Sequence, residues 1–339
     1  MSKMGKVVFI TLIILLAAII VFLGVMSLMK WDFTRLSFSK FETNEHTVKG
    51  PFSDIAVIGD TARIAFLPSE DGDTRVICYE KERAKHTVSV EDGRLIIALD
   101  DQRKWYDHIN IFGSSTSVTV YLPAGEYGDL TVKRKTGKLE IPADFSFASV
   151  GIEGSTGDTL LAASSRGALS VKASTGDIRL LGVTAGSVEL RASTGDITLA
   201  SVISSGNVSL SVSTGEIRAN GVGCAGDATV SVSTGRARLL DFTCKNLVST
   251  GDTGNLILTN VIAEEAFTIE RSTGDILFTS CDAAAISVKT GTGDVEGSLR
   301  SDKIFYAKTG SGRIDVPSST SGGLCEVRTS TGKIILSIE

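Results

Sequence analysis

The sequence has few of the features that mark nucleic-acid-binding, disulfide-rich or zinc-binding proteins. Its formal net charge is −5, so no basic excess suggests a nucleic-acid partner. The five cysteines are scattered and none forms a C-x-x-C pair, so we expect no disulfide framework, no metal site and no cofactor. All three histidines (His46, His86 and His108) precede residue 129, which excludes a Ser-His-Asp set beyond that point.

Aromatic residues are also rare, at 6% of the chain. After residue 128 there is no tryptophan and a single tyrosine, Tyr306, so the exposed aromatic rings favoured by sugar-binding platforms are missing there. Trp105 and Tyr106 precede that region, and we expect them to pack in a core rather than to bind a ligand. Proline is scarce at 5 residues and glycine frequent at 35, which predicts many short strands joined by tight turns.

A long apolar run stands near the N-terminus. Val7–Met29 carries no charged residue over 23 positions, and a membrane-spanning helix needs about 20. Lys3 and Lys6 precede the run, which predicts a cytoplasmic N-terminus and an extracytoplasmic body. The alternative is a cleaved signal peptide, whose apolar core is usually about 7–15 residues long and has a small-x-small exit. This run is longer and lacks that exit, so we expect residues 1–30 to form an uncleaved single-pass anchor.

An internal repeat dominates the rest of the chain. The tetrapeptide Ser-Thr-Gly-Asp occurs at residues 155–158, 174–177, 193–196 and 272–275, with close variants between and beyond. Eleven such units follow one another at intervals of 19 or 20 residues, the regularity expected of a solenoid. Their glycines are Gly137, Gly157, Gly176, Gly195, Gly215, Gly235, Gly254, Gly274, Gly293, Gly312 and Gly332.

Apolar residues keep fixed distances from each of these glycines. The positions seven and five before the glycine, and two and four after it, are apolar in 41 of 44 cases, the exceptions being Thr159, Ser249 and Gly297. This alternation predicts a strand on each side of the glycine with one face inward. A further apolar column seven after the glycine indicates a third short segment. The glycine is expected at the corner between the strands, where a positive φ needs a residue without a Cβ.

A repeat of this length is too short for a helical crossover and fits one turn, or rung, of a parallel β-helix. The fold class is therefore all-β. We expect residues 129–339 to form a single-stranded, right-handed parallel β-helix of about eleven rungs, stacked in sequence order about 4.8 Å apart. Residues 31–128 also alternate, with a hairpin signal at Asp92-Gly93, and are predicted to form a β-rich module that caps the rod.

Several of these segments together resemble a known family. The stretches DIAVIGDTARIAFLPSEDGDTRVICYEKE, VSVEDGRLII, RKWYDHINIF and VTVYLP, followed by the Thr-Gly-Asp rungs, are similar to the putative-adhesin family of bacterial β-strand-repeat proteins, whose relatives include toastrack-type envelope domains. The resemblance covers most of residues 50–339. It implies a β-helix outside the membrane, associated with Gram-positive envelope-stress or adhesion systems, and it supplies no catalytic residue.

Acidic residues recur directly after the corner glycines. Asp158, Asp177, Asp196 and Glu216 would form a surface ladder at intervals of about 5 Å if the rungs stack in register. One interpretation is a ladder that binds cations. The other, which we favour, is that these side chains accept backbone N–H bonds at the turns and face water. Basic residues interrupt the line further along, and the nine-residue calcium repeat is absent.

The residues four before each glycine form an outward-facing column in which basic residues outnumber acidic ones. One interpretation is a solvated face that discourages aggregation, and the other is a face for an anionic envelope polymer. The column comprises Lys133, Glu153, Lys172, Arg191, Ser211, Ser231, Thr250, Glu270, Lys289, Lys308 and Arg328.

Two cysteines, Cys224 and Cys244, both follow their corner glycine by nine residues on adjacent rungs. In-register stacking would bring their Cα atoms within disulfide range. We expect them to be buried and reduced, because neighbouring parallel positions seldom give the torsion that a disulfide needs.

These observations predict a membrane-anchored, extracytoplasmic β-solenoid without enzymatic activity. We expect it to serve as an interaction, adhesion or scaffold module of the bacterial cell envelope, with envelope proteins or an anionic cell-wall polymer as partners. One alternative is a polysaccharide-acting enzyme of β-helix type, which would need clustered carboxylates in different environments. Another is a structural protein that associates end to end, because the chain ends in TGKIILSIE, on a strand with no evident cap.

Overall fold

One apolar helix and a long stack of strands make up the chain. The computed structural model describes residues 3–28, 40–102 and 116–339. Helix α1 (Lys3–Leu28) contains the segment Thr11–Leu28, which is long and apolar enough to cross a membrane. Trp105, Tyr106 and His108, for which roles were predicted above, lie outside the described residues, as does the end of the predicted anchor.

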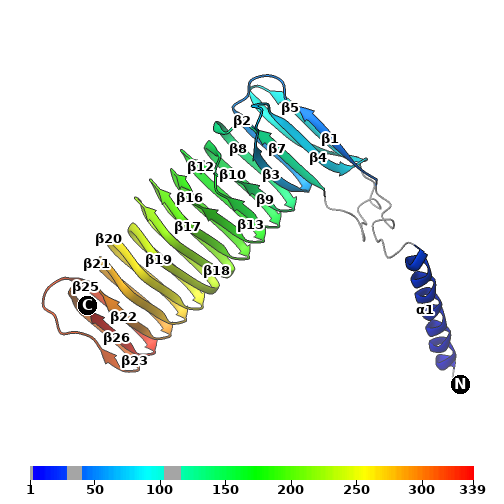
Figure 1. Cartoon of the computed structure of the whole chain (residues 1–339). Helices are drawn as coiled ribbons and strands as arrows, with labels where there is room; N and C mark the ends of the chain where they lie inside the picture. The colour runs from blue at the N-terminus through cyan, green and yellow to red at the C-terminus, as the bar shows by residue number, and fades with distance from the viewer. Residues whose placement is uncertain (1–2, 29–39, 103–115) are drawn as a thin grey trace.

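Parallel strands stacked along one axis build the rod, as the repeat predicts (Figure 1). Most rungs have one strand before the corner glycine and one after it, whereas the strands run without interruption through the corners at Gly215 and Gly235. In chain order the strands up to residue 299 are β8 (Gly125–Thr136), β9 (Leu139–Ile141), β10 (Phe145–Thr156), β11 (Thr159–Leu161), β12 (Ser164–Ser165), β13 (Ala168–Thr175), β14 (Ile178–Leu181), β15 (Thr184–Ala185), β16 (Ser187–Thr194), β17 (Ile197–Ser204), β18 (Val208–Cys224), β19 (Ala228–Thr253), β20 (Leu256–Thr273), β21 (Ile276–Thr292) and β22 (Val295–Leu299).

The rungs stack in the register that the apolar columns predict. Leu169 and Val171 of β13 lie directly beside Val188 and Leu190 of β16, and this pairing repeats from rung to rung. The inward columns are almost fully buried and form one continuous core. The predicted third segment is present as β12 and β15, and its apolar column is also buried. Because each rung covers the next, the core extends along the whole rod.

The corner glycines have two independent reasons to be glycine. Their φ angles lie between 110° and 152°, a region that side chains with a Cβ rarely enter. In addition, a Cβ added at any of them would lie 1.5–2.5 Å from the carbonyl oxygen of the corner residue one rung nearer the cap. The glycines are therefore stacked on one another at the corners between the strands.

A second corner follows each of six successive corner glycines by six residues, and the sequence reading did not identify it. Its residues all have φ between 51° and 65°, the left-handed region that glycine and short polar residues tolerate best. They are Gly182, Ser201, Gly221, Asp241, Asn260 and Ser280. Neighbouring side chains also bond along this column, where Asn260 Nδ2 donates to Asp241 Oδ1 over 2.5 Å.

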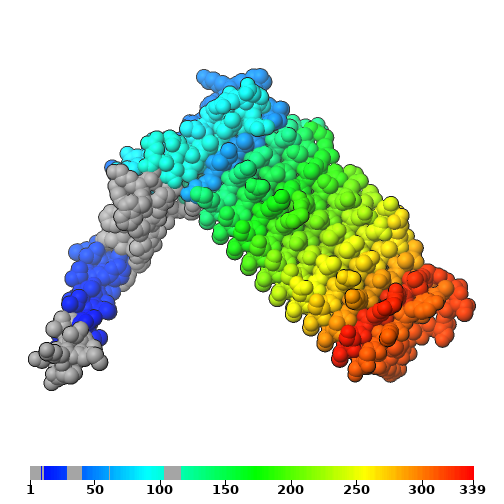
Figure 2. All heavy atoms as spheres, turned by 180° about the vertical axis from the view of Figure 1, so that it is seen from behind, coloured from blue at the N-terminus to red at the C-terminus, as the bar shows by residue number. Residues whose placement is uncertain are grey.

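The cap continues the rod with further layers. β2 (Asp54–Thr61) and β3 (Arg63–Pro68) pair in parallel with β8 and β9, and Ala62 stands where a corner glycine would stand. β6 (Arg94–Asp101) covers β2 and β7 (Ser117–Leu122) covers β3. The outermost strands are antiparallel: β5 (Ala84–Glu91), β4 (Arg75–Lys81) and β1 (Phe41–Thr47). The hairpin expected at Asp92-Gly93 joins β5 to β6. Figure 2 shows cap and rod as one continuous surface.

The last two rungs stack in the reverse of their sequence order, so the expectation of strict sequence order is wrong at this end. β25 (Gly323–Thr331) lies between β21 and β23 (Lys303–Ser311), and β26 (Ile334–Ile338) lies between β22 and β24 (Ile314–Asp315) (Figure 1). The final strand is therefore internal rather than uncapped. Pro317 offers a physical reason, because proline has no N–H for the ladder and is tolerated best at a sheet edge. Accordingly, the rung that precedes Pro317 occupies the end.

Candidate functional site

The four predicted ladder acids lie in one line along the rod. Each aspartate carboxylate accepts the backbone N–H of the corresponding residue in the next rung. Asp177 N–H donates to Asp158 Oδ1 over 3.0 Å, Asp196 N–H to Asp177 Oδ1 over 3.0 Å, and Glu216 N–H to Asp196 Oδ1 over 2.9 Å. The carboxylate therefore supplies an acceptor for an N–H that would otherwise lie unpaired at the corner.

The same hydrogen bond recurs in the second half of the rod. Asn255 Oδ1 accepts the N–H of Asp275, and Asp275 Oδ1 accepts the N–H of Asp294, both over 3.0 Å. Asp294 Oδ1 then accepts the N–H of Lys333 over 2.9 Å, which follows the reversed order of the last rungs. Because a neutral amide performs this role at Asn255, the bond needs a short acceptor and not a charge.

Three of the four ladder acids also pair with arginine side chains. Arg218 Nη1 lies 2.9 Å from Asp196 Oδ2, and its Nη2 lies 2.5 Å from Glu216 Oε2. Arg179 Nη2 lies 2.7 Å from Asp177 Oδ2. A calcium ion takes about six to eight oxygen ligands, whereas these oxygens already bind N–H groups and guanidinium groups. The geometry thus favours structural hydrogen bonding over cation binding.

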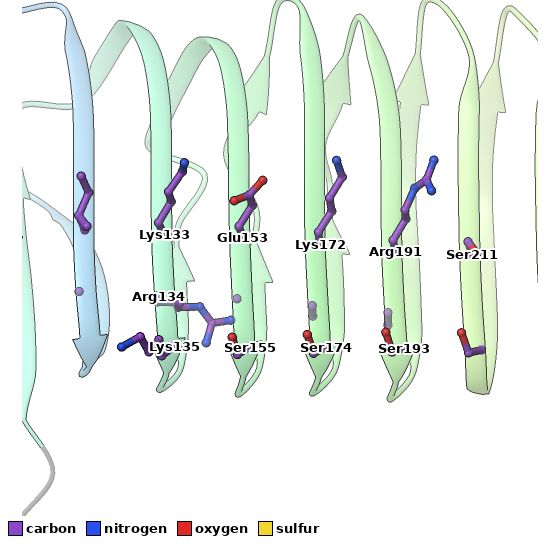
Figure 3. A pocket seen from close by; sticks show the side chains of 16 residues that line it. Lys133, Arg134, Lys135, Glu153, Ser155, Lys172, Ser174, Arg191, Ser193 and Ser211 are labelled. Carbon is purple, nitrogen blue, oxygen red and sulfur yellow. The ribbon is translucent and has the colours of Figure 1, made fainter. Parts of the chain in front are cut away.

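A shallow groove crosses the strands on the outward face before the corner, and we call it the basic groove. It has a volume of about 680 Å³. Figure 3 shows two rows of side chains on successive strands of the groove. The row farther from the corner contains Lys133, Glu153, Lys172, Arg191 and Ser211, and the row nearer the corner contains Lys135, Ser155, Ser174, Ser193 and Ser213.

The basic groove has more basic than acidic residues, unlike the whole chain. Its two rows hold four basic residues and one acid, whereas the formal net charge of the chain is −5. Arg191 is paired with Glu189 at 2.7 Å, and Lys135 with Asp60 at 3.2 Å. Within the described part of the chain, Lys133 and Lys172 form no ion pair. The two lysines therefore present ammonium groups beside a row of hydroxyl groups, a combination that suits an anionic, hydroxyl-bearing ligand.

The repeat and the rung geometry agree with a family match. Residues 52–240, more than half of the chain, match the family described as Toastrack DUF4097. The chain belongs to this toastrack family. No curated protein sequence matches it.

Solved structures from Bacteroides and Parabacteroides species are similar to this chain. A protein described as a "putative adhesin" from Parabacteroides distasonis is 12% identical, with a TM-score of 0.40, and the match covers 89% of this chain and 98% of that one. Another from Parabacteroides merdae is 9% identical, with a TM-score of 0.40 and the same shares covered. A third from Bacteroides fragilis is 16% identical, with a TM-score of 0.35, covering 88% of this chain and 97% of that one.

The toastrack rod contains two buried arginines that the sequence reading did not identify. Arg134, three before its corner glycine, is 5% exposed and lies beneath the basic groove (Figure 3). Its Nη2 donates to Gly157 O over 3.0 Å and to Thr159 Oγ1 over 2.7 Å, and burial lowers the pKa of its guanidinium. Thr159, one of the three exceptions in the apolar columns, is thus polar because it accepts this bond.

Arg271 repeats this arrangement farther along the toastrack rod. It is 4% exposed, and its Nη2 donates to Ser249 Oγ over 2.9 Å, which accounts for the second polar exception. Burial lowers the pKa of Arg271 to about 10, so it stays charged at neutral pH. Gly251 leaves the space that its guanidinium fills, since a Cβ there would lie 1.7 Å from Arg271 Nη1. In the sequence, two features together indicate such a buried arginine. One is an arginine three residues before a corner glycine, and the other is a polar residue in an apolar column.

The cysteines of the toastrack rod are buried and free, as predicted for Cys224 and Cys244. The Cys224 thiol donates to Gly206 O over 3.2 Å. Burial raises the pKa of Cys244 to about 12, which keeps its thiol protonated and unreactive.

Proposed function

We propose that the chain is a membrane-anchored, extracytoplasmic interaction module of the cell envelope, without catalytic activity. Helix α1 would be the anchor, because it is long and apolar enough to cross a membrane and because Lys3 and Lys6 favour a cytoplasmic N-terminus. The toastrack body would then lie outside the membrane, where an adhesion or scaffold role in an envelope-stress or surface system fits its rigid, elongated form.

The basic groove is the observation that carries this proposal. It follows the rod axis, so that a linear polymer lying along the rod would meet one rung every 4.8 Å or so. Lys133, Lys172 and Arg191 would contact its anionic groups, and the serine row would bond to its hydroxyl or phosphate oxygens. We therefore propose that the groove holds an anionic, linear envelope polymer.

An absence of catalysis is also part of the proposal, and it rests on the state of the acids. β-Helix enzymes that cleave polysaccharides need carboxylates held in two different environments within a cleft. The ladder acids instead lie at a corner, where the three aspartates accept neighbouring N–H groups and three of the four acids pair with Arg179 or Arg218. This arrangement supports a structural role for Asp158, Asp177, Asp196 and Glu216.

Binding of poly(glycerol phosphate) to the purified full-length chain tests the groove. We expect the K133S/K172S/R191S variant to bind at least about tenfold more weakly, a loss of about 1.4 kcal/mol spread over three charges. Binding by the unchanged chain should weaken at high salt, and neutral dextran should not bind.

The matched control replaces Lys289, Lys308 and Arg328 by serine, which removes the same charge from exposed positions of the same column. Equal losses in both variants would show attraction to net charge alone and would contradict the proposal.

End-to-end association is a second candidate, favoured by the terminal rung. Ile314 is 44% exposed there because no further rung covers it, whereas the equivalent Ile334 is buried. A second copy could cover this end with its own terminal rung. Sedimentation of the full-length chain over a range of concentrations decides the point, since a molecule that stays monomeric at every concentration would rule this role out.

A further inference from the structure

A cysteine, a glutamate and a histidine meet inside the cap, away from the basic groove. Cys78 and Glu80 lie on the inward face of β4, and His86 lies two residues into the returning strand β5. Cys78 Sγ, a carboxylate oxygen of Glu80 and a ring nitrogen of His86 all lie within 4.8 Å of one another. The three residues are 0%, 1% and 5% exposed, respectively. No other group of three such residues is found in the described ranges, which lack residues 29–39 and 103–115.

Glu80 holds the histidine ring in one orientation. Its Oε2 accepts the backbone N–H of His86 over 2.7 Å and lies 2.7 Å from His86 Nδ1. Its Oε1 accepts a bond from Asn44 Nδ2 over 2.8 Å. Oε2 and Nδ1 therefore face each other across a single proton, with Cys78 Sγ close by. A cation in the place of that proton would be bound by both atoms, and the proton would move to the other ring nitrogen of His86.

The charges also suit a cation at this point. Glu80 is a buried carboxylate whose ion-pair partner is His86. Burial and the nearby Glu80 raise the pKa of Cys78 to about 12, so its thiol is protonated when no metal is present. A divalent cation would displace that proton to solvent, and one thiolate and one carboxylate would then neutralise its two charges. Sulfur and imidazole nitrogen are ligands that zinc prefers.

We propose that Cys78, Glu80 and His86 form a structural Zn²⁺ site that joins β4 to β5 in the cap. Cys78 Sγ, one Glu80 oxygen and His86 Nδ1 would bind the ion and leave the fourth position of its tetrahedron to water. The site would hold the outermost strands of the cap together.

Metal content of the full-length chain tests this site. The protein would be produced with Zn²⁺, and separately with Co²⁺, in the medium, purified in detergent and dialysed before elemental analysis. We expect about one metal ion per chain, and a thiolate-to-metal charge-transfer band in the cobalt form. C78A should lose the band and at least about 90% of the metal. The matched control C325A removes another buried thiol, whose pKa is also raised to about 12, and should keep both.

Two further measurements keep the test decisive if C78A folds poorly. H86N leaves Cys78 in place and should also lose most of the metal. A chelator should lower the thermal unfolding midpoint of the unchanged chain and of C325A by the same amount. A chain that retains no metal, shows no charge-transfer band and unfolds at one temperature with or without chelator would overturn the proposal. Glu80 would then act only as a hydrogen-bond acceptor for the hairpin corner.

Discussion

At the scale of single residues, the Thr-Gly-Asp unit is a structural part of the rung corner. Glycine is required because a Cβ at this position would collide with the carbonyl oxygen of the corner residue on the adjacent rung. Where an aspartate follows the glycine, its carboxylate accepts an N–H that has no backbone acceptor, because the strand ladder is interrupted at that corner. The glycine avoids a steric clash and the aspartate pairs a free N–H, and both problems arise from the same sharp turn. This is why the two residues recur together.

Asp177 provides the test of this structural interpretation. Asp177→Ala removes the acceptor for Asp196 N–H and should lower the free energy of unfolding by about 1–2 kcal/mol. Asp177→Asn keeps an oxygen at the same place, as Asn255 does for Asp275, and should cost less than about 0.5 kcal/mol. Urea unfolding followed by circular dichroism measures both variants.

The same variants separate the structural role from cation binding. A hydrogen-bond acceptor predicts that millimolar calcium leaves the unfolding midpoint of the unchanged chain where it is. A cation ladder predicts that calcium raises that midpoint and that Asp177→Asn abolishes the increase, because the amide carries no charge. Equal destabilisation by the alanine and asparagine variants would contradict the hydrogen-bond account.

At the scale of elements, the sequence spacing predicted the features that repeat with a fixed period. It did not predict the features that lack a common residue type or spacing, or the order of rungs with similar sequences. The inward columns and the glycine corner follow from strict alternation around each glycine, so they could be predicted. The second corner was missed because its residues share a backbone conformation but not a side-chain type, as Ser201 and Asp241 illustrate. The buried arginines were missed because Arg134 and Arg271 occupy a position that is otherwise small or apolar. The cluster around Cys78 was missed because its residues come from two strands and match no spacing motif.

The order of the last two rungs shows the same limit. Both rungs carry suitable apolar residues at the same distances from their glycines, so periodicity cannot decide which of them lies at the end. Pro317 and the two-residue length of β24 decide it in the folded state, because a short strand followed by proline cannot pair on both sides.

Alanine substitution at equivalent positions of the two rungs tests this order. Ile334 and Ile314 both stand two after their corner glycine, but Ile334 is 0% exposed and Ile314 is 44% exposed. We expect Ile334→Ala to cost about 3 kcal/mol, because it leaves a cavity in a covered layer, and Ile314→Ala to cost about 1 kcal/mol or less. Chemical denaturation of the two variants, which differ only in the rung that is altered, gives the comparison. Stacking in sequence order would reverse the ranking.

At the scale of the whole molecule, the cap and the rod are one stack of layers, and each layer contacts only its neighbours. Ile55 of the cap lies directly beside Leu130 of the first rung, in the same column that continues through the rod. Stability should accordingly be close to a sum of rung terms and interface terms, rather than the property of one central core. The basic groove uses this regularity, because identical strand spacing places its charges in a row.

Removal of one whole rung is the strongest consequence of this organisation. Deleting the 20 residues 217–236 joins Glu216 to Ala237, which occupy consecutive positions of the repeat, and leaves every residue of the basic groove in place. Val202 would then contact Phe242 as Val222 does now, so the inward columns stay continuous. We expect this variant to keep its β-type circular dichroism, its resistance to proteolysis and its affinity for poly(glycerol phosphate). Deleting only residues 217–226 shifts each later segment by half a rung, which turns strands into corners and should abolish all three. If the two deletions were equally damaging, stability would not be a sum over rungs, and the rod would have to fold as a single cooperative unit.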